Sequence, residues 1–156
     1  MKRVTHSPIQ TFQLGKKLAK NLKGGDIITL SGELGAGKTV FIKGLAAGLG
    51  VKQTVRSPSF NLLKIYTASK KRQFVHVDCY RLKSPIEAIE IGLFDFLAEP
   101  KTIVAIEWPE KIKILLKKYH LKKIKISTRG GSAFGGKNLK ENCRQIIIPS
   151  RGLPRR

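Results

Sequence analysis

The residues with the clearest capacity for chemistry form one loop, Gly32-Glu33-Leu34-Gly35-Ala36-Gly37-Lys38-Thr39. Their spacing matches the phosphate-binding pattern G-x-x-x-x-G-K-[ST]. Glycine permits a positive φ, so that successive backbone N–H groups turn towards one anion. A lysine in this pattern reaches the outer phosphates, and the final hydroxyl is a ligand for Mg²⁺. Lys38 and Thr39 are therefore predicted to contact a nucleotide and its metal ion.

The segments on either side of this loop are of the kind that the motif requires. The apolar run Asp26–Leu30 predicts a buried strand, and Val40–Leu49 predicts a helix that ends at Gly50. Such a helix directs the positive end of its dipole at a bound phosphate. The order of strand, loop and helix favours nucleotide binding over a chance glycine-rich turn.

Two acidic residues come at the ends of later apolar strands. Asp78 follows a strand predicted at 74–77, and Glu107 follows one predicted at 102–106. Ligands of α/β sheets bind at the carboxyl ends of the strands, where phosphate-loop enzymes keep a carboxylate that organises Mg²⁺. Both acids are therefore expected beside the loop. His76 lies on the same strand face as Asp78, and a structural role is favoured for it over a catalytic one.

One further helix is predicted from a capping box, Ser84-Pro85-Ile86-Glu87. Serine is expected at the N-cap, proline at the first helical position and glutamate at the third. The helix should run to about Leu97 and bury Ile86, Ile89 and Leu93, together with Phe96 or Leu97. Glu87 is then explained by capping rather than by catalysis.

The remaining elements complete an alternation of strands and helices. Ser7-Pro8 opens a helix that Gly24-Gly25 ends. Further strands are predicted at 61–66, 121–127 and 144–148, a further helix at 111–119, and a glycine-rich loop at 129–142. The pattern predicts an α/β fold, a three-layer sandwich like that of P-loop NTPases with a mostly parallel central sheet. We expect one domain over residues 1–149 and a disordered basic end at 150–156.

Positive charge is concentrated in the last third of the chain. Lysine and arginine number 31 against 10 acidic residues, and 14 of the basic residues but only 1 acidic residue lie in 111–156. Such a segment favours acidic partners, nucleic acid first among them. A solvated basic surface without a partner is the alternative.

Composition also limits the location and the cysteine chemistry. The chain contains no apolar run of the ~18 residues needed to span a bilayer and no apolar signal core after Met1–Val4. A cytosolic location is the expectation. Cys79 and Cys143 form no C-x-x-C pair and are expected to be free thiols. The three histidines are too far apart in sequence to suggest a metal site.

Four motifs in register resemble the bacterial TsaE (YjeE) family, the small ATPase of tRNA threonylcarbamoyladenosine synthesis. The motifs are Gly32–Thr39, Ser57-Pro58-Ser59-Phe60, His76-x-Asp78-x-Tyr80-Arg81-Leu82 and Ile106-Glu107-Trp108. The opening Thr11-x-x-x-Gly15 helix agrees with them. The resemblance covers about residues 7–127, and Ser59 stands where the family usually has Thr.

The resemblance implies an ATPase that uses ATP and Mg²⁺, with the metal bound through Thr39 and Glu107. Asp78 would be a catalytic acid or would position the groups around the metal. The family acts with TsaB and TsaD, which install threonylcarbamoyl on adenosine 37 of ANN-decoding tRNAs, and its own hydrolysis of ATP should be slow without them. Contact with tRNA would be indirect or through the basic C-terminal region. The implied catalytic residues are Lys38, Asp78 and Glu107, and the implied nucleotide-binding residues are Thr11, Glu33, Leu34, Gly35, Ala36, Gly37, Lys38, Thr39 and Val40.

Two other classes of protein remain open at this point. A small-molecule kinase also pairs a phosphate loop with a short α/β domain, but it needs an acceptor site and lid arginines, for which Arg56 and Arg81 are the candidates. A GTPase is disfavoured because the sequence contains no N-K-x-D guanine signature. A nucleic-acid-binding protein that uses the basic region would leave Asp78, Glu107 and the phosphate loop unexplained.

Overall fold

A computed structural model of the protein describes residues 1–58, 61–128 and 143–148. Ser59, the predicted glycine-rich loop at 129–142 and the predicted disordered end at 150–156 lie outside these residues. The elements in chain order are β1 (Lys2–Thr5), α1 (Pro8–Ala19), β2 (Ile27–Ser31), α2 (Lys38–Gly48), β3 (Leu63–Ala68), β4 (Arg72–Asp78), α3 (Ile86–Glu90), α4 (Leu93–Leu97), β5 (Thr102–Glu107), the 3₁₀ helix η1 (Pro109–Ile112), α5 (Lys113–Leu116), β6 (Leu121–Thr128) and β7 (Arg144–Ile147).

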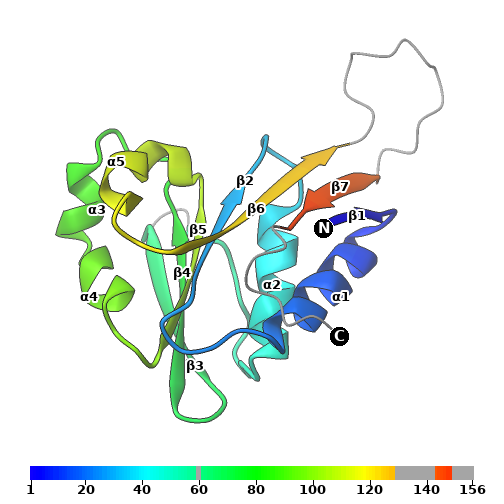
Figure 1. The fold of residues 1–156 in the computed structure, drawn as a ribbon, viewed down its shortest axis with the longest axis horizontal. Coiled ribbons are helices and arrows are strands. Elements are labelled where there is room, and N and C mark those ends of the chain that lie inside the picture. Colours follow the sequence, from blue (N-terminus) through cyan, green and yellow to red (C-terminus); the bar gives the residue numbers. More distant parts are fainter. Residues whose placement is uncertain (59–60, 129–142, 149–156) are drawn as a thin grey trace.

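The described strands form one sheet in the order β1-β7-β6-β2-β5-β4-β3. The central pairs are parallel: β2 with β5 and with β6, and β4 with β5. The pairs nearer the edges are antiparallel: β1 with β7, β6 with β7, and β3 with β4. The predicted sheet, mostly parallel at its centre, is confirmed (Figure 1).

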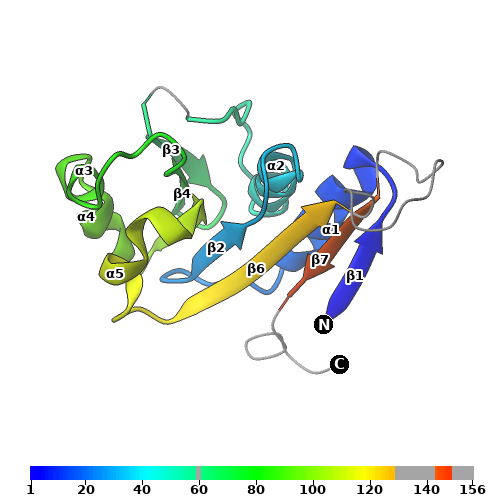
Figure 2. The same ribbon diagram turned by 90° about the horizontal axis from the view of Figure 1, so that it is seen from above.

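Helices cover both faces of this sheet. Figure 2 shows α1 and α2 on one side and α3, α4 and α5 on the other, so the predicted three-layer α/β architecture is confirmed. Each face has its own apolar core. Phe41 and Ile28 belong to the core beneath α1 and α2, and Val77 and Leu116 to the core on the opposite side.

The first helix begins as its sequence predicts. The Ser7 hydroxyl accepts a hydrogen bond of 3.1 Å from the Gln10 N–H, which satisfies one of the donors left unpaired at a helix start. Glycines then let α1 and α2 pack backbone to backbone. A Cβ at Gly15 would overlap the Phe41 carbonyl, and a Cβ at Gly44 would overlap the Phe12 carbonyl. The α1–α2 pair is therefore a close, rigid support for the start of α2.

The single helix predicted from Ser84 to Leu97 is wrong. It is divided into α3 and α4 by Gly92, whose φ of 71° lies in the left-handed region that interrupts a helix. The capping box does not form, because Pro85 occupies the N-cap position. The Glu87 carboxylate instead accepts a hydrogen bond from the Lys83 N–H at 3.2 Å.

The break also changes which side chains are buried. Ile86 and Ile89, which were expected in the core, are 62% and 52% exposed. Leu93 and Leu97 are buried as predicted, and Ala88, which was not predicted in the core, is buried as well. The helix predicted at 111–119 is likewise shorter, since it consists of η1 followed by the four residues of α5.

Strand β1 was not predicted. Three of its four residues are exposed, so no alternation of apolar and polar residues marks it in the sequence. It exists because β7 pairs with it, with Lys2 opposite Ile147 and Thr5 opposite Arg144.

The described helices include none long and apolar enough to cross a membrane. Both cysteines are buried free thiols, as predicted. Burial, reinforced by the nearby Asp78 carboxylate, raises the pKa of Cys79 to about 12.

Candidate nucleotide-binding site

The glycines of the loop between β2 and α2 adopt conformations that other residues rarely adopt. The φ angles of Gly32, Gly35 and Gly37 are 147°, 78° and 100°. At Gly32 a Cβ would also overlap the Ile126 carbonyl of β6. Gly37 is the N-cap of α2 and offers no side chain to the first turn, which leaves the helix N–H groups available to an anion. The backbone is that of an anion-binding loop.

Lys38 is folded back over the loop. Its Nζ donates hydrogen bonds to the carbonyls of Gly32 at 2.7 Å and Glu33 at 2.9 Å. The same ammonium lies 3.8 Å from the centre of the Trp108 ring, within the range of a cation–π contact. Burial lowers the pKa of Lys38, while the Glu107 carboxylate acts in the opposite direction. The ammonium is thus desolvated and held at the place where outer phosphates would lie.

The Thr39 hydroxyl and the Glu107 carboxylate meet at the start of α2. Thr39 Oγ1 donates to Glu107 Oε1 at 2.9 Å and lies 3.3 Å from Oε2. Glu107 is 3% exposed, and its Oε1 lies 2.9 Å from Nε2 of the fully buried His76. His76 therefore orients the carboxylate that faces Thr39, which is the structural role expected for it.

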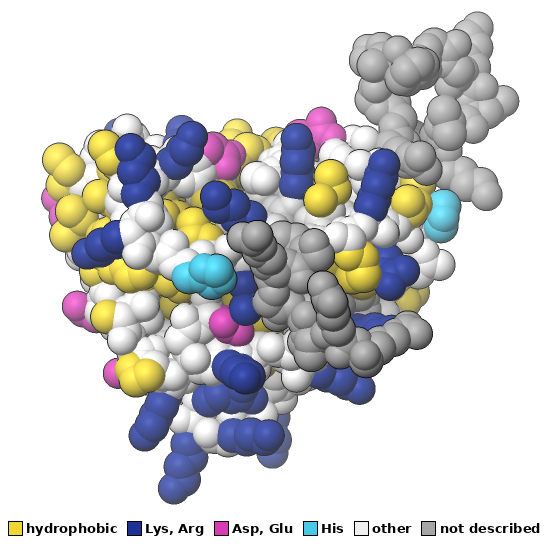
Figure 3. Space-filling view, viewed as in Figure 1, with side chains coloured by type: hydrophobic (Ala, Val, Ile, Leu, Met, Phe, Trp, Pro, Cys, Tyr) yellow, Lys and Arg dark blue, Asp and Glu magenta, His cyan; other side chains and the backbone are white. Residues whose placement is uncertain are grey.

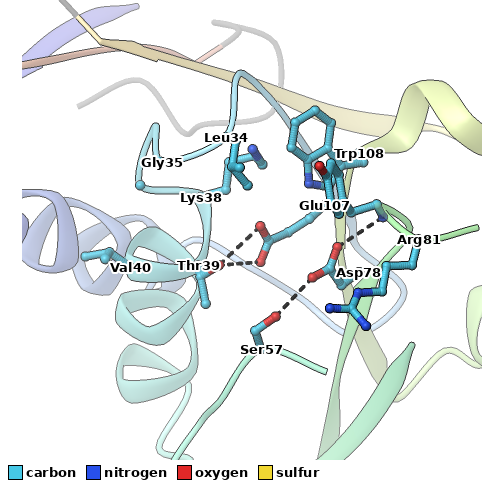
Figure 4. Close-up of a pocket in the computed structure, with 12 residues that line it drawn as sticks. Leu34, Gly35, Lys38, Thr39, Val40, Ser57, Asp78, Arg81, Glu107 and Trp108 are labelled. Atoms are coloured by element: carbon cyan, nitrogen blue, oxygen red, sulfur yellow. Dashed lines mark hydrogen bonds between the residues drawn. The ribbon is translucent and has the colours of Figure 1, made fainter. Parts of the chain in front are cut away.

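Asp78 lies beside Glu107 because β4 and β5 are parallel and in register, with these two residues opposite each other. Its Oδ2 accepts from the Ser57 hydroxyl at 3.0 Å, and its Oδ1 accepts from the Tyr80 N–H at 3.1 Å. Figure 4 shows both carboxylates pointing into the space between α2 and the strand ends, as the sequence predicts.

A cavity of about 430 Å³ joins these groups. Its described lining combines the loop, the first residues of α2 and the ends of β4 and β5. The structure brings eight of the predicted site residues together in it: Leu34, Gly35, Gly37, Lys38, Thr39, Val40, Asp78 and Glu107.

Three predicted nucleotide-binding residues lie outside the lining of this cavity. Thr11 is buried behind the loop, where its hydroxyl lies 2.8 Å from that of Thr5. Ala36 is buried with its methyl group in the core. Glu33 points away, and its carboxylate accepts hydrogen bonds from the N–H and hydroxyl of Thr128, which lowers its pKa. A role for Thr11 in holding adenine stays a prediction.

Four residues that were not predicted as site residues also line the cavity: Ser57, Tyr80, Arg81 and Trp108. All four belong to the motifs that carry the family resemblance. Their position in these motifs, next to predicted site residues, is the sequence feature that could have identified them. Tyr80 and Trp108 stack, with ring centres 4.9 Å apart. Trp108 also contacts Lys38, so it forms a wall of the cavity.

The residues present suit a magnesium ion that keeps phosphate and water ligands better than they suit a metal ion held entirely by protein side chains. No group of three or more histidine, cysteine or acidic residues suited to a metal occurs within the described ranges. Mg²⁺ commonly takes only one or two protein ligands and completes its shell with phosphate oxygens and water. One hydroxyl and one carboxylate beside a phosphate loop are such a donor set.

Comparison with known proteins agrees with these motifs. A family model described as "Threonylcarbamoyl adenosine biosynthesis protein TsaE" matches residues 5–134. The tRNA threonylcarbamoyladenosine biosynthesis protein TsaE of Streptomyces coelicolor is 40% identical over 99 residues, which cover 63% of this chain and 66% of the relative. The Rickettsia conorii protein of the same name is 44% identical over 112 residues, covering 71% and 62%. The aligned part is thus slightly under two thirds of each relative's length.

The fold agrees as well. The crystal structure of Bacillus subtilis YdiB superimposes with a TM-score of 0.70 at 30% sequence identity, covering 95% of this chain and 83% of that chain. The family model spans most of the chain and includes every motif that contributes to the cavity. The chain belongs to the TsaE family of threonylcarbamoyl adenosine biosynthesis proteins.

Proposed function

We propose that this protein is a Mg²⁺-dependent ATPase required for N6-threonylcarbamoylation of adenosine 37 in ANN-decoding tRNAs, acting in the cytoplasm with TsaB and TsaD. The observation that carries the proposal is the contact of the Thr39 hydroxyl with Glu107 at the start of α2. It pairs the two oxygen donors that a phosphate-loop enzyme uses for its metal. Membership of the TsaE family supports the place in tRNA modification.

Different groups of the chain would bind different parts of the nucleotide and its metal ion. The N–H groups of the loop and of the first turn of α2 hold the inner phosphates. The Lys38 ammonium leaves the carbonyls of Gly32 and Glu33 for the outer phosphates, which are the stronger acceptors because they are charged. Thr39 and Glu107 would hold Mg²⁺, which supplies charge neutralisation when bound. Asp78, fixed by Ser57, is the acid available to orient the attacking water.

We further propose that hydrolysis is slow in the isolated chain. Arg81 is the arginine that lines the cavity in the described part of the chain, and it is exposed at the rim. Phosphate-loop enzymes that lack a well-placed arginine gain about 10³-fold or more when a partner supplies one. TsaB and TsaD are the partners expected to complete the site.

The domain proposed for this activity is residues 1–149. The Met1 amino group donates to the Ile148 carbonyl at 2.5 Å, and the Ile148 N–H donates to the Met1 carbonyl at 2.8 Å. These bonds extend the pairing of β1 and β7 to Ile148, the last residue that the structure describes.

The test is the modified-nucleoside content of tRNA from cells depleted of this protein and complemented with variants. Wild type and Lys43→Ala, which removes an exposed lysine of α2, should restore threonylcarbamoyladenosine, and Lys38→Ala should not. In a purified system with TsaB and TsaD the products should be ADP and inorganic phosphate. Normal modification in depleted cells, or a phosphorylated small molecule as product, contradicts the proposal and favours the kinase alternative.

A further inference from the structure

A second groove, of about 570 Å³, lies on the face of the sheet opposite α1 and α2. Its floor is the end of β2, where the side chains of Thr29 and Ser31 line it. The segment of η1 and α5 forms one wall, and the start of β6 forms the other (Figures 1 and 2). Neither the phosphate loop nor the carboxylates of the first cavity reach into this groove.

The rim of the groove is positively charged. Lys113 and Lys117 stand on the α5 wall and Lys123 on the β6 wall, and all three are exposed. Within the described residues none of these three lysines forms an ion pair with an acidic side chain. His120 also lines the groove, and Glu110 is the acidic side chain of its described lining. Unpaired cations around a hollow are suited to a phosphate-bearing ligand.

The same charge continues beyond the groove along a part of the sheet that no described helix covers on this side. On β6 the next residue on this face is Lys125, which is in register with Ile147 of β7, which in turn pairs with Lys2 of β1. Figure 2 shows α1 and α2 on the other side of these three strands, and no described helix lies on this side. Figure 3 shows lysine and arginine side chains spread over the molecular face seen in Figure 1.

An extended row of lysines suits an extended polyanion rather than a single phosphate group. RNA presents regularly spaced phosphates, and each phosphate that a lysine neutralises releases counterions, which drives binding. Thr29 adds a hydroxyl donor for phosphate or ribose oxygens on the groove floor, whereas the Ser31 hydroxyl donates to the Ile124 carbonyl of β6 at 3.5 Å. The choice of RNA over another polyanion rests on the proposed role in tRNA modification.

The groove is joined to the nucleotide site by consecutive residues. Glu107 and Trp108 line the first cavity, whereas Pro109 and Glu110 line the groove. Trp108 has a φ of 57°, and its N–H donates to the Leu30 carbonyl of β2 at 3.2 Å. A ligand that shifts η1 must therefore act on the two residues that contact Thr39 and Lys38.

We propose that the groove between α5 and β6 binds the phosphate backbone of RNA, and that its occupancy changes nucleotide affinity through the segment 107–110. The groove is a binding surface separate from the nucleotide cavity, and the two ligands are coupled. Because coupling between two sites is reciprocal, RNA alters ATP affinity by the same factor by which ATP alters RNA affinity.

Binding is tested with the full-length protein and an unmodified transcript of an ANN-decoding tRNA, by fluorescence anisotropy over a range of salt concentrations. The variant Lys113→Glu/Lys123→Glu removes two groove cations. The matched control Lys20→Glu/Lys43→Glu makes the same change of charge at exposed positions of the α1–α2 layer. Melting temperatures verify folding, and Lys113→Gln/Lys123→Gln repeats the test without introducing acids.

The groove variant should bind roughly tenfold or more weakly, and the slope of log affinity against log salt should fall by about 2, one unit for each phosphate that is no longer neutralised. The control should keep the wild-type slope. Equal weakening in both variants indicates unspecific attraction to a basic protein and overturns the proposal. If the affinity for a polyglutamate peptide depends on Lys113 and Lys123 and the affinity for the transcript does not, the groove binds an acidic protein segment and the RNA assignment is wrong.

The coupling is tested by calorimetry with a non-hydrolysable ATP analogue, with and without the transcript. The affinity of the ATP analogue for the wild-type protein should change by about fivefold or more when RNA is present, and its affinity for the groove variant should not change. An unchanged affinity overturns the coupling. In the absence of RNA both proteins should bind the analogue equally, because the groove lysines lie outside the nucleotide cavity. Failure of wild type to bind the analogue would instead contradict the proposed ATPase function.

Discussion

At the scale of single residues, Glu107 combines two tasks that substitutions are able to separate. One carboxylate oxygen accepts from Thr39 and lies against His76, whose Nδ1 has no partner among the described residues. The side chain is therefore both an oxygen donor towards the nucleotide cavity and the partner of a fully buried imidazole. Removing the carboxylate and removing only its charge should have different consequences.

We expect Glu107→Gln to keep the wild-type melting temperature and to lose Mg²⁺-dependent ATP hydrolysis. The amide oxygen or nitrogen still pairs with His76, but a neutral amide is a poor ligand for Mg²⁺. Glu107→Ala should lose hydrolysis and also about 1–3 kcal/mol of stability, because it leaves both nitrogens of the buried His76 unpaired. Urea unfolding and an ATPase assay measure the two effects. An active Glu107→Gln variant would show that the carboxylate is structural.

Trp108 is the single tryptophan of the chain, and the Lys38 ammonium lies over its ring. Binding of an ATP analogue should draw the ammonium to the phosphates and thereby change the intrinsic fluorescence of the protein. Lys38→Met removes the cation, so its free form should already differ from wild type, and the analogue should produce little further change. A wild-type spectrum that is insensitive to saturating analogue would mean that the ammonium stays on the ring.

At the scale of elements, the sequence is a good guide where structure is decided locally. The Ser7 cap, the phosphate loop and the apolar strands before Asp78 and Glu107 all depend on neighbouring residues, and parallel pairing of β4 with β5 then brings the acids together. Other features depend on distant parts of the chain. Strand β1 has no apolar alternation and requires β7, and the wall formed by Trp108 follows from packing at the end of β5.

The interruption at Gly92 is a different kind of failure. A single glycine inside an amphipathic segment is compatible with a continuous helix, at a cost of about 1 kcal/mol. Only the tertiary structure shows that Gly92 adopts a left-handed conformation here and turns α4 so that Leu93 is fully buried. The capping residues at Ser84 favour a helix start equally well in either case, so the sequence did not distinguish one helix from two.

The α1–α2 contact gives a prediction at this scale. Gly44→Ala places a methyl group against the Phe12 carbonyl, a backbone atom that cannot move without displacing α1. Overpacking of this kind costs about 1–3 kcal/mol, which exceeds the gain of up to about 1 kcal/mol from replacing a helical glycine. Thermal unfolding should show a lower melting temperature, whereas Lys43→Ala, at an exposed position of the same helix, should be close to neutral. A higher melting temperature for Gly44→Ala would mean that α1 can move away from the added methyl group at little cost in free energy.

At the scale of the whole molecule, the net charge of +21 destabilises the folded state. Like charges on a compact protein repel one another, and unfolding moves them apart. Compensation is limited, because 10 acidic residues cannot provide a separate partner for each of 31 basic residues; Lys122 with Asp26 is one lysine–carboxylate ion pair that does form. Screening by salt should therefore weaken the repulsion between like charges more than it weakens the attraction within ion pairs.

The melting temperature should consequently rise as salt is increased from about 0.01 M to about 0.1 M, over which the Debye length falls from about 30 to about 10 Å. Circular dichroism at several sodium chloride concentrations measures the change. Lys122→Ala should show the same trend, since this partly buried ion pair is a single pair and contributes little to stability compared with the repulsion among the remaining basic residues. A melting temperature that falls with salt would mean that attractive pairs outweigh the repulsion.

The pairing of β1 with β7 also determines an order of events during protein synthesis. Residues 2–5 leave the ribosome before the other described strands, but their hydrogen-bonding partners are residues 144–147, the last of the described strands to emerge. The parallel pairs of β2, β4, β5 and β6 are complete once residue 128 has emerged. Strand β1 therefore has no partner among the described strands until β7 has emerged, and a nascent chain stalled before residue 144 would carry the central sheet without this edge.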